Sequence, residues 1–267
     1  MKNSEQKKGF GTVFTALVIP TLLVIAIVIY KYVFGDPSHF QGGDPHNNPI
    51  QGDFFGVIYK GGFIVPILMT CLMMVLTFSI ERLIAITRAK GKGSSAAFLR
   101  NLKSNLAQGN IDACEAACAK QRGALGNVCQ AVLASYKYNA KDTTMSKEQK
   151  LASLQKNVEE ATALELPTLE QNLVILATLS SISTLIGLLG TVLGMIRAFS
   201  ALANAGAPDS VALSAGISEA LINTALGIGS AAIAIIFYNI FTTQIDKITY
   251  NIDEAGYSMV QSFAEKH

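Results

Sequence analysis

Four long stretches of this chain carry almost no charged side chain. No Asp, Glu, Lys or Arg lies between Lys8 and Lys31, between Lys60 and Glu81, or between Glu170 and Arg197, and Glu219 is the one charge between Asp209 and Asp246. A membrane-spanning helix needs about 20 apolar residues, because about 1.5 Å of rise per residue must cover about 30 Å of hydrocarbon. The pattern therefore predicts four transmembrane helices, over residues 10–32, 62–84, 171–198 and 214–244.

Composition also favours a membrane protein. Of the 267 residues 50% are hydrophobic and 15% are charged, whereas a soluble surface usually needs about 25% charged residues. The net charge of +2 is too small for a nucleic-acid-binding surface, so we expect no nucleic-acid partner. The sequence holds no nucleophile–base motif, zinc motif or phosphate-binding loop. We therefore expect that the chain is not an enzyme and needs no cofactor or metal.

The distribution of Lys and Arg predicts the orientation. These residues number three in 1–9, one in 33–61, twelve in 85–170, none in 199–213 and two in 245–267, and basic loops stay preferentially cytoplasmic. The counts predict a cytoplasmic N-terminus and C-terminal tail, outer loops at 33–61 and 199–213, and a cytoplasmic segment at 85–170. The first stretch has a long apolar core and no small-residue cleavage site after it, so we expect a retained anchor.

The cytoplasmic segment is predicted to be a helical domain. Spaced apolar residues and good helix formers occur over 95–107, 111–120, 124–138 and 146–170, with breaks at Gly109-Asn110 and Gly123. We expect the last helix to start near Ser146 and to run without a break into the third span, so that it projects into the cytoplasm. The fold class is therefore all-α, a polytopic membrane protein with a helical cytoplasmic domain and long projecting helices.

Two groups of potential metal ligands favour a structural interpretation. Cys114 and Cys118 lie four residues apart on a predicted helix, but a zinc site needs more ligands at suitable spacing. We expect these cysteines to be small buried apolar residues. The loop 33–61 is rich in Gly, Pro, Asn and Asp and is predicted to be an irregular connector. His39 and His46 within it favour a solvated polar loop over metal binding.

The third and fourth spans carry small and hydroxyl side chains at helical spacing. The third has Ser180, Thr184, Gly187, Thr191, Gly194 and Ala198, with Gly190 beside them, and the fourth has Gly216, Glu219, Ala220, Asn223, Thr224, Gly227, Ala231 and Ala234. Tight packing of two helices through small residues explains such stripes. A polar face toward a pore or a partner helix explains them equally well, and the two interpretations are compatible.

Glu219 is a functional candidate because an ionised carboxyl at membrane depth is costly. Desolvation favours its protonated form. The alternative is a carboxyl near the outer end of the span that is hydrogen-bonded to neighbouring helices or water. In antiparallel spans Thr191 and Thr224 would lie at similar depth. Their hydroxyls both donate and accept, so they can order water or contact a proton carrier, but they cannot carry a proton themselves.

Two motifs resemble the membrane signatures of the MotA/TolQ/ExbB proton channel family. They are Gly187–Ile196, which reads GLLGTVLGMI, and Gly216–Gly227, which reads GISEALINTALG and is followed by Tyr238-Asn239. The ExbB and TolQ branch is the most similar, over about residues 62–250. Gly109–Glu115 resembles a cytoplasmic helix motif of the family. Glu81-Arg82 is similar to the family's pair at the cytoplasmic interface. From chemistry alone this pair is an interfacial stop, with basic side chains that reach lipid headgroups.

The resemblance implies a proton-channel or stator subunit in a bacterial inner membrane. Such subunits form a homopentameric ring around an ExbD- or TolR-like single-span partner, whose intramembrane Asp carries protons. Proton flow drives mechanical work on the envelope, for example on TonB-dependent outer-membrane transport through a TonB- or TolA-like protein. By position, Thr191, Thr224, Glu219 and Asn223 would line the proton pathway. The helix-packing stripe would comprise Gly187, Gly190, Gly194 and Gly227.

The chain also departs from the family pattern. An extra N-terminal span and the loop 33–61 precede the similar region, and Thr184 stands where the family often has Pro. We expect the extra span to be a peripheral helix. Two other functions stay open, a structural membrane scaffold that conducts nothing and a motor of the Tol or gliding type with a different client.

Overall fold

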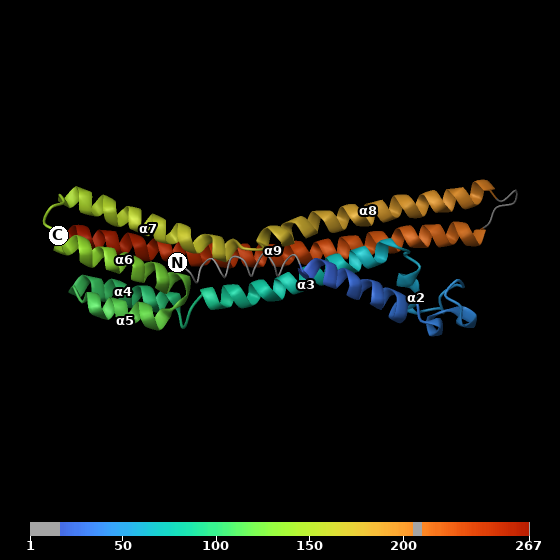
Figure 1. Cartoon of the computed structure of the whole chain (residues 1–267), viewed down its shortest axis with the longest axis horizontal. Helices are drawn as coiled ribbons and strands as arrows, with labels where there is room; N and C mark the ends of the chain where they lie inside the picture. Colours follow the sequence, from blue (N-terminus) through green and yellow to red (C-terminus); the bar gives the residue numbers. More distant parts are fainter. Residues whose placement is uncertain (1–16, 205–209, 267) are drawn as a thin grey trace. The chain divides into compact units, whose positions relative to one another are not determined.

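Helices form almost all of the part of the chain that the structure describes, residues 17–204 and 210–266 (Figure 1). In this computed structural model the helices are 17–29 with a π-helical turn at Tyr30–Phe34, α2 Phe54–Tyr59, α3 Ile64–Ala89, α4 Ser95–Gln108, α5 Ile111–Gln121, α6 Gly123–Lys141, α7 Lys147–Glu170, α8 Leu173–Asn204 and α9 Ser210–Lys266. Within those ranges no strand occurs, and one isolated bridge pairs Phe40 with Pro49. The predicted N-terminus 1–9, residues 10–16 of the first span, residues 205–209 of the short loop and His267 lie outside the described residues.

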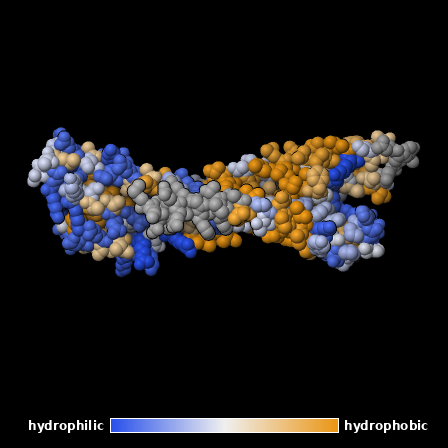
Figure 2. Space-filling view, in the orientation of Figure 1, coloured by the Kyte–Doolittle hydropathy of each residue, from blue (hydrophilic) through white to orange (hydrophobic). Residues whose placement is uncertain are grey.

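Among the described residues, four helical stretches are long and apolar enough to cross a membrane. They lie in Leu17–Phe34, Ile64–Ala89, Lys147–Ala203 and Ser210–Lys266, and their most apolar windows have mean hydropathies of 2.0 to 2.3. Hydrophobic side chains cover the surface of α8 and its neighbours, whereas hydrophilic side chains gather over α4, α5 and α6 (Figure 2). The predicted class, an all-α polytopic membrane protein, is confirmed.

The chain forms two compact units. The first, called the membrane unit, comprises the described residues up to Ser79 together with Ile175–Phe237. The second, called the helical unit, comprises Ile80–Val174 and the described part of Tyr238–His267. Three helices, α3, α8 and α9, contribute residues to both units.

The helical unit is a bundle of α4 to α7 and the last part of α9. The four helices predicted for 85–170 are confirmed, each within three residues of its predicted ends. The core is apolar and includes Leu102, Leu106, Cys114, Cys118, Cys129, Leu133, Leu154, Ile252, Met259 and Phe263. The burial expected of Cys114 and Cys118 is thus confirmed. Residues 245–266, predicted only as a tail, are helical and belong to this core.

Side-chain caps explain where these helices begin. Ser94 accepts from the Ala97 amide, and Asn110 accepts from the Ala113 amide. Ser146 and Gln149 form a reciprocal capping box at the start of α7. Such caps satisfy amides that have no partner within the helix.

The expectation of one unbroken helix from Ser146 into the third span is wrong. The α7 helix ends at Glu170, and α8 begins at Leu173. Between them Asn172 has φ of 62°, a left-handed conformation that ends a helix. Pro167 lies inside α7 and does not end it.

Glu81 and Arg82 hold this break in place within the helical unit. Arg82 donates through Nη1 to the Leu169 carbonyl at 3.3 Å, and through Nε to the Glu81 carboxylate at 2.7 Å. Asn172 Nδ2 donates to the same carboxylate at 3.2 Å. Arg82 is 2% exposed. The interpretation of its side chain as one that reaches lipid headgroups is therefore wrong, because it caps the last carbonyls of α7 instead.

The loop between the first two spans is more ordered than predicted. It contains α2 and short 3-10 turns at Pro37–His39 and Gln41–Gly43. Asp53 caps α2 by accepting from the Phe55 and Gly56 amides, and its carboxylate bonds His39 Nδ1 at 2.8 Å. The segment 33–61 is thus an irregular connector with one short helix, and local caps and aromatic contacts hold it together.

The membrane helices differ in extent from the predicted spans. The α3 helix begins at Ile64, after a turn at Gly61-Gly62 in which Gly62 has φ of 75°. At the other loop, α8 continues to Asn204 and α9 begins at Ser210. Much of the loop predicted at 199–213 is therefore helical.

Replacing Arg82 by Met should destabilise the α7–α8 break. The substitution leaves the Leu169 carbonyl without the Arg82 donor and the Glu81 carboxylate with Asn172 as its remaining partner, at a cost of about 3 kcal/mol. We expect a glutamate-specific protease to cleave after Glu170 faster in Arg82→Met than in the wild type. Arg88→Met is the matched control, because Arg88 is exposed on the same helix. Equal cleavage rates in Arg82→Met and the control would contradict the capping role.

The cap of α2 should be lost only in acid. The pKa of Asp53 lies below its usual value because the Gly56 amide, and then the His39 side chain, hydrogen-bond to the carboxylate. A pKa lowered in the folded state adds stability that is present above the unfolded value of about 3.9 and is lost as the pH falls through the folded value. Hydrogen-exchange protection factors of the Phe55 and Gly56 amides should be constant from neutral pH to about 5 and fall in stronger acid. A loss of protection already near neutral pH would show that another group controls the cap.

Candidate functional site

The α8 and α9 helices of the membrane unit pack against each other through small residues. A Cβ atom added at Gly187 would lie 3.0 Å from the Gly227 Cα, and one at Gly194 would lie 2.7 Å from the Ala220 nitrogen. Real Cβ atoms essentially never approach to less than 3.0 Å, and a distance of 3.0 Å is tighter than nine in ten real Cβ contacts. At the far end of the contact Gly216 meets Ala198 in the same way. The order of these pairs makes the helices antiparallel, and the packing interpretation of the stripes is supported by this geometry.

Near the beginning of α8, the buried face is not the one that the spacing of small and hydroxyl residues suggests. Ser183 is fully buried and its carbonyl lies against Gly227, whereas Thr184 is exposed. At Thr184 the stripe therefore does not pack against α9. The helical period of 3.6 residues allows either neighbour to lead to Gly187, and the sequence does not distinguish the two.

Thr191 and Thr224 meet across the helix contact. Their hydroxyl oxygens hydrogen-bond to each other, and either can donate. Thr191 Oγ1 also donates to the Gly187 carbonyl at 3.2 Å, and Thr224 Oγ1 donates to the Ala220 carbonyl at 3.1 Å. Both side chains are half-buried. The structure thus brings together the two threonines that the motifs singled out.

Glu219 pairs with Arg197 across the same two helices. Arg197 Nη1 lies 2.6 Å from Oε1 and 2.8 Å from Oε2 of the Glu219 carboxyl group. The carboxyl side chain is 8% exposed, while that of the arginine is 52% exposed. The guanidinium also lies over the Phe63 ring, 5.6 Å from its centre. Arginine stays protonated in proteins, so this is a charge-assisted contact at the edge of an apolar region.

Asn223 faces away from the two threonines. It is fully buried, and its Nδ2 donates to the Gly61 carbonyl at 2.8 Å. Its Oδ1 has no hydrogen-bond partner among the described residues. The Asn223 side chain packs against Gly190, where an added Cβ would lie 2.4 Å from the Asn223 Cβ. Asn223 therefore joins α9 to the turn before α3.

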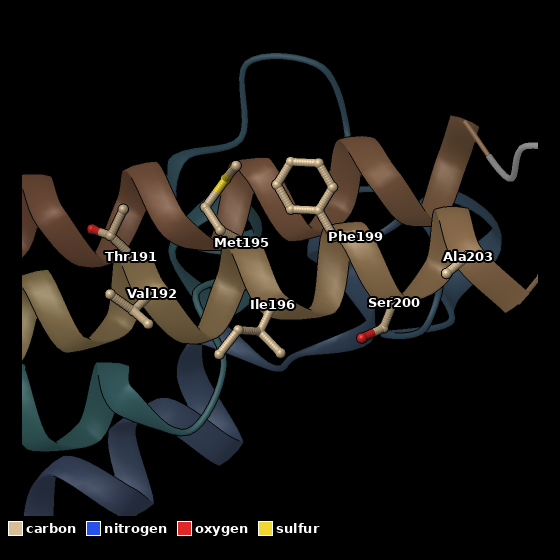
Figure 3. A pocket seen from close by; sticks show the side chains of 7 residues that line it. All are labelled: Thr191, Val192, Met195, Ile196, Phe199, Ser200 and Ala203. Atoms are coloured by element: carbon tan, nitrogen blue, oxygen red, sulfur yellow. The ribbon is translucent and has the colours of Figure 1, made fainter.

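A groove runs along α8 from Thr191 toward the helix end (Figure 3). Its volume is about 590 Å³, and it is lined by Thr191, Val192, Met195, Ile196, Phe199, Ser200 and Ala203. Thr191 and Ser200 supply the hydroxyl groups of this otherwise apolar surface. Glu219, Asn223 and Thr224 do not line it. The groove therefore presents only one of the four predicted pathway residues.

Arg197 was not predicted from the sequence as the partner of Glu219. A signal was present, because Arg197 is the only basic residue between Glu170 and Asp246. An isolated acid in an apolar helix pairs preferentially with such a base. The close approach of Gly62 to Glu219 was also missed. It depends on a loop fold for which the sequence gives no spacing rule.

Comparison with known proteins identifies a family that matches this part of the chain. The model of the MotA/TolQ/ExbB proton channel family matches residues 125–254, a segment that holds both threonines, Arg197, Glu219 and Asn223. Residues 125–254 thus match the MotA/TolQ/ExbB proton channel family. Relatives of the chain place it in the ExbB/TolQ-like branch.

Three relatives illustrate the similarity. The chain is 40% identical over 86 residues to the putative biopolymer transport protein ExbB-like 3 of Synechocystis sp., which is 32% of this chain and 41% of that protein. It is 40% identical over 84 residues to the Tol-Pal system protein TolQ of Haemophilus influenzae, 32% of this chain and 37% of that one. It is 41% identical over 70 residues to the biopolymer transport protein ExbB of Salmonella typhimurium, 26% of this chain and 29% of that one.

The chain thus spans less than half the length of these relatives. Glu81-Arg82, Gly109–Glu115 and the extra first span lie outside the residues that the family model matches. For these segments the resemblance stays a prediction.

The small-residue contact should make Gly190 intolerant of a side chain. In Gly190→Ala the new Cβ would overlap the Asn223 Cβ, so the helices must shift at a cost of about 1 to 3 kcal/mol. Gly229→Ala is the matched control, because nothing lies within 4 Å of a Cβ at that position in α9. Alanine favours the helix there by up to about 1 kcal/mol. In mild detergent we expect a lower apparent Tm for Gly190→Ala and an equal or higher one for Gly229→Ala; equal values for both variants would contradict the contact.

Proposed function

We propose that this chain is a proton-channel subunit of an energy-transducing complex in a bacterial inner membrane, with both termini in the cytoplasm. The complex would convert the proton motive force into mechanical work on the cell envelope. The observation that carries the proposal is the meeting of Thr191 and Thr224 inside an apolar helix pair, within the residues that match a proton channel family. The role is that of a transport component and not of an enzyme.

The threonine pair supplies polar groups where the surroundings offer few. A proton that crosses a membrane needs water or hydroxyl groups along its path, because the hydrocarbon solvates no charge. The Thr191 side chain also lines the groove on α8 (Figure 3). A partner helix in that groove would bring a proton carrier to the hydroxyl pair.

The Arg197–Glu219 pair places a half-exposed guanidinium near one end of this path. Arg197 lies six residues beyond Thr191, which is about 9 Å along the helix axis. Its guanidinium is half exposed, and its partner Glu219 is buried. A base and an acid at this position would set the local potential that an approaching proton meets.

The proposed assembly is a homopentameric ring around an ExbD- or TolR-like partner with one intramembrane Asp. A TonB- or TolA-like protein would pass the force to the outer membrane. Names of relatives support both the biopolymer transport and the Tol-Pal possibilities. Large apolar side chains on the exposed face of α8 favour contact with lipid or other membrane helices; they are Leu185, Leu188, Leu189, Val192 and Ile196.

A second candidate function is a membrane scaffold that conducts nothing. The small-residue contact of α8 with α9 favours it, because such contacts assemble helices without any transport. Proton flux distinguishes the two functions. The scaffold predicts liposomes as tight as empty ones, with or without the partner.

Thr224→Val should abolish proton flux and leave insertion and folding intact. Valine keeps the shape of threonine and removes the hydroxyl that bonds Thr191. We expect liposomes that contain the purified complex to acidify under an imposed gradient, and those with Thr224→Val or Thr191→Val to behave as empty ones. Thr243→Val is the control, since Thr243 is exposed on α9 and its hydroxyl bonds only the Asn239 carbonyl. Full flux in both site variants would refute the role of the threonine pair.

A further inference from the structure

The turn at Gly61-Gly62 lies directly against Glu219 and Asn223. Asn223 Nδ2 donates to the Gly61 carbonyl at 2.8 Å. At Gly62 there is no room for a side chain, because an added Cβ would lie 2.6 Å from Glu219 Oε1 and 3.5 Å from Arg197 Nη1. The backbone of this turn therefore covers the carboxyl group of the ion pair.

The first span and the loop that follows it hold the turn in position. Tyr30, at the end of the first span, donates its hydroxyl to the Tyr59 carbonyl at 2.9 Å, and the two rings stack 4.7 Å apart. The Tyr59 carbonyl also accepts from the Gly62 amide at 3.2 Å. On the other side of Tyr59, Phe40 packs edge-on at 5.4 Å. One carbonyl thus links the first span to the turn.

Lys60 also connects the turn to the preceding loop. Its ammonium group donates to the carbonyls of Pro45 at 2.9 Å and His46 at 3.1 Å. It also lies over the Phe40 ring, 5.5 Å from its centre. Because Lys60 immediately precedes Gly61, these contacts limit the movement of the turn away from Glu219.

Most of the first span differs from its C-terminal end in its contacts. Only 6% of its apolar window is buried, against 56% for the window of α3, so most of its length is free to face lipid as expected of a peripheral helix. Its end is different. There the Tyr30 hydroxyl donates to the Tyr59 carbonyl, which also accepts from the Gly62 amide.

We propose that the Gly61-Gly62 turn is a positioning element that seals Glu219 from solvent and holds its carboxyl group against Arg197. Tyr30, Tyr59 and Lys60 fix the turn, so the extra span and its loop are an integral part of the pathway site. Solvent and protons then reach the pair from the side of the half-exposed Arg197. The inference rests on the proposed function only in treating Glu219 as a pathway residue.

Carboxyl labelling of the intact complex in mild detergent tests this assignment. A water-soluble carbodiimide with an amine couples to accessible carboxyl groups, and mass spectrometry reads the fraction modified at Glu219. In Gly62→Ala the new Cβ pushes the turn away from the carboxyl group, so Glu219 should be labelled several-fold faster than in the wild type. An unchanged rate would overturn the proposal.

Gly52→Ala is the matched control for backbone strain. Gly52 lies in the same loop with φ of 86°, and nothing lies within 4 Å of an added Cβ. Both variants therefore strain the backbone, but only Gly62→Ala meets Glu219. The Glu219 labelling rate in Gly52→Ala should equal that of the wild type. If the Glu219 labelling rate rose as much in Gly52→Ala as in Gly62→Ala, the effect would not depend on the contact with Glu219, and the proposal would be overturned.

A second variant covers the case in which Gly62→Ala unfolds the complex. Labelling of Glu254, which pairs with Lys103 in the helical unit, reports such unfolding. If the labelling of Glu254 rises in Gly62→Ala, Tyr30→Phe is the variant that tests the proposal. This change removes only the hydroxyl bond to the Tyr59 carbonyl and keeps the stacked ring. Glu219 labelling should rise in Tyr30→Phe with Glu254 unchanged. Labelling needs no transport, so absence of proton flux in the wild type would refute the proposed function and leave this result standing.

Discussion

The contact on which the candidate site depends is the close approach of α8 and α9 through glycine and alanine. Without side chains at Gly187, Gly194 and Gly227 the two backbones touch, and at that separation the short threonine side chains reach each other across the helices. The same contact brings Thr191 to Thr224 and Arg197 to Glu219. Packing and polar chemistry are therefore two consequences of one stripe, and the loss of the packing would separate both pairs.

Patterns that depend on local physics predicted much of this structure. Stretches without charged residues, each long enough as a helix to span a bilayer, predicted four apolar helices. The spacing of apolar residues, together with cap residues such as Ser146, predicted the helices of the helical unit. The motif spacing and antiparallel spans predicted that Thr191 and Thr224 would lie at one depth. Each of these predictions uses only neighbours along the chain or the thickness of the membrane.

The features that escaped prediction depend on contacts between distant segments. Asn172 ends a helix pattern that has no proline or glycine at that point, and Arg82, from a helix about ninety residues earlier, caps the carbonyls that become free. Gly62 lies against Glu219 because the loop before it folds on Tyr59. No periodicity encodes such pairings. Charge counting would have found one of them, since Arg197 is the only base available to Glu219 in that stretch.

The central claim is that this chain works as the membrane ring of a proton-driven complex. The most direct measurement is mass spectrometry of the chain purified in mild detergent from its own membranes. The account predicts a co-purifying protein with a single apolar span that contains one Asp, in a fixed ratio to a defined oligomer of this chain. A defined oligomer that reproducibly lacks any such protein would contradict it and would favour a scaffold or an independent channel.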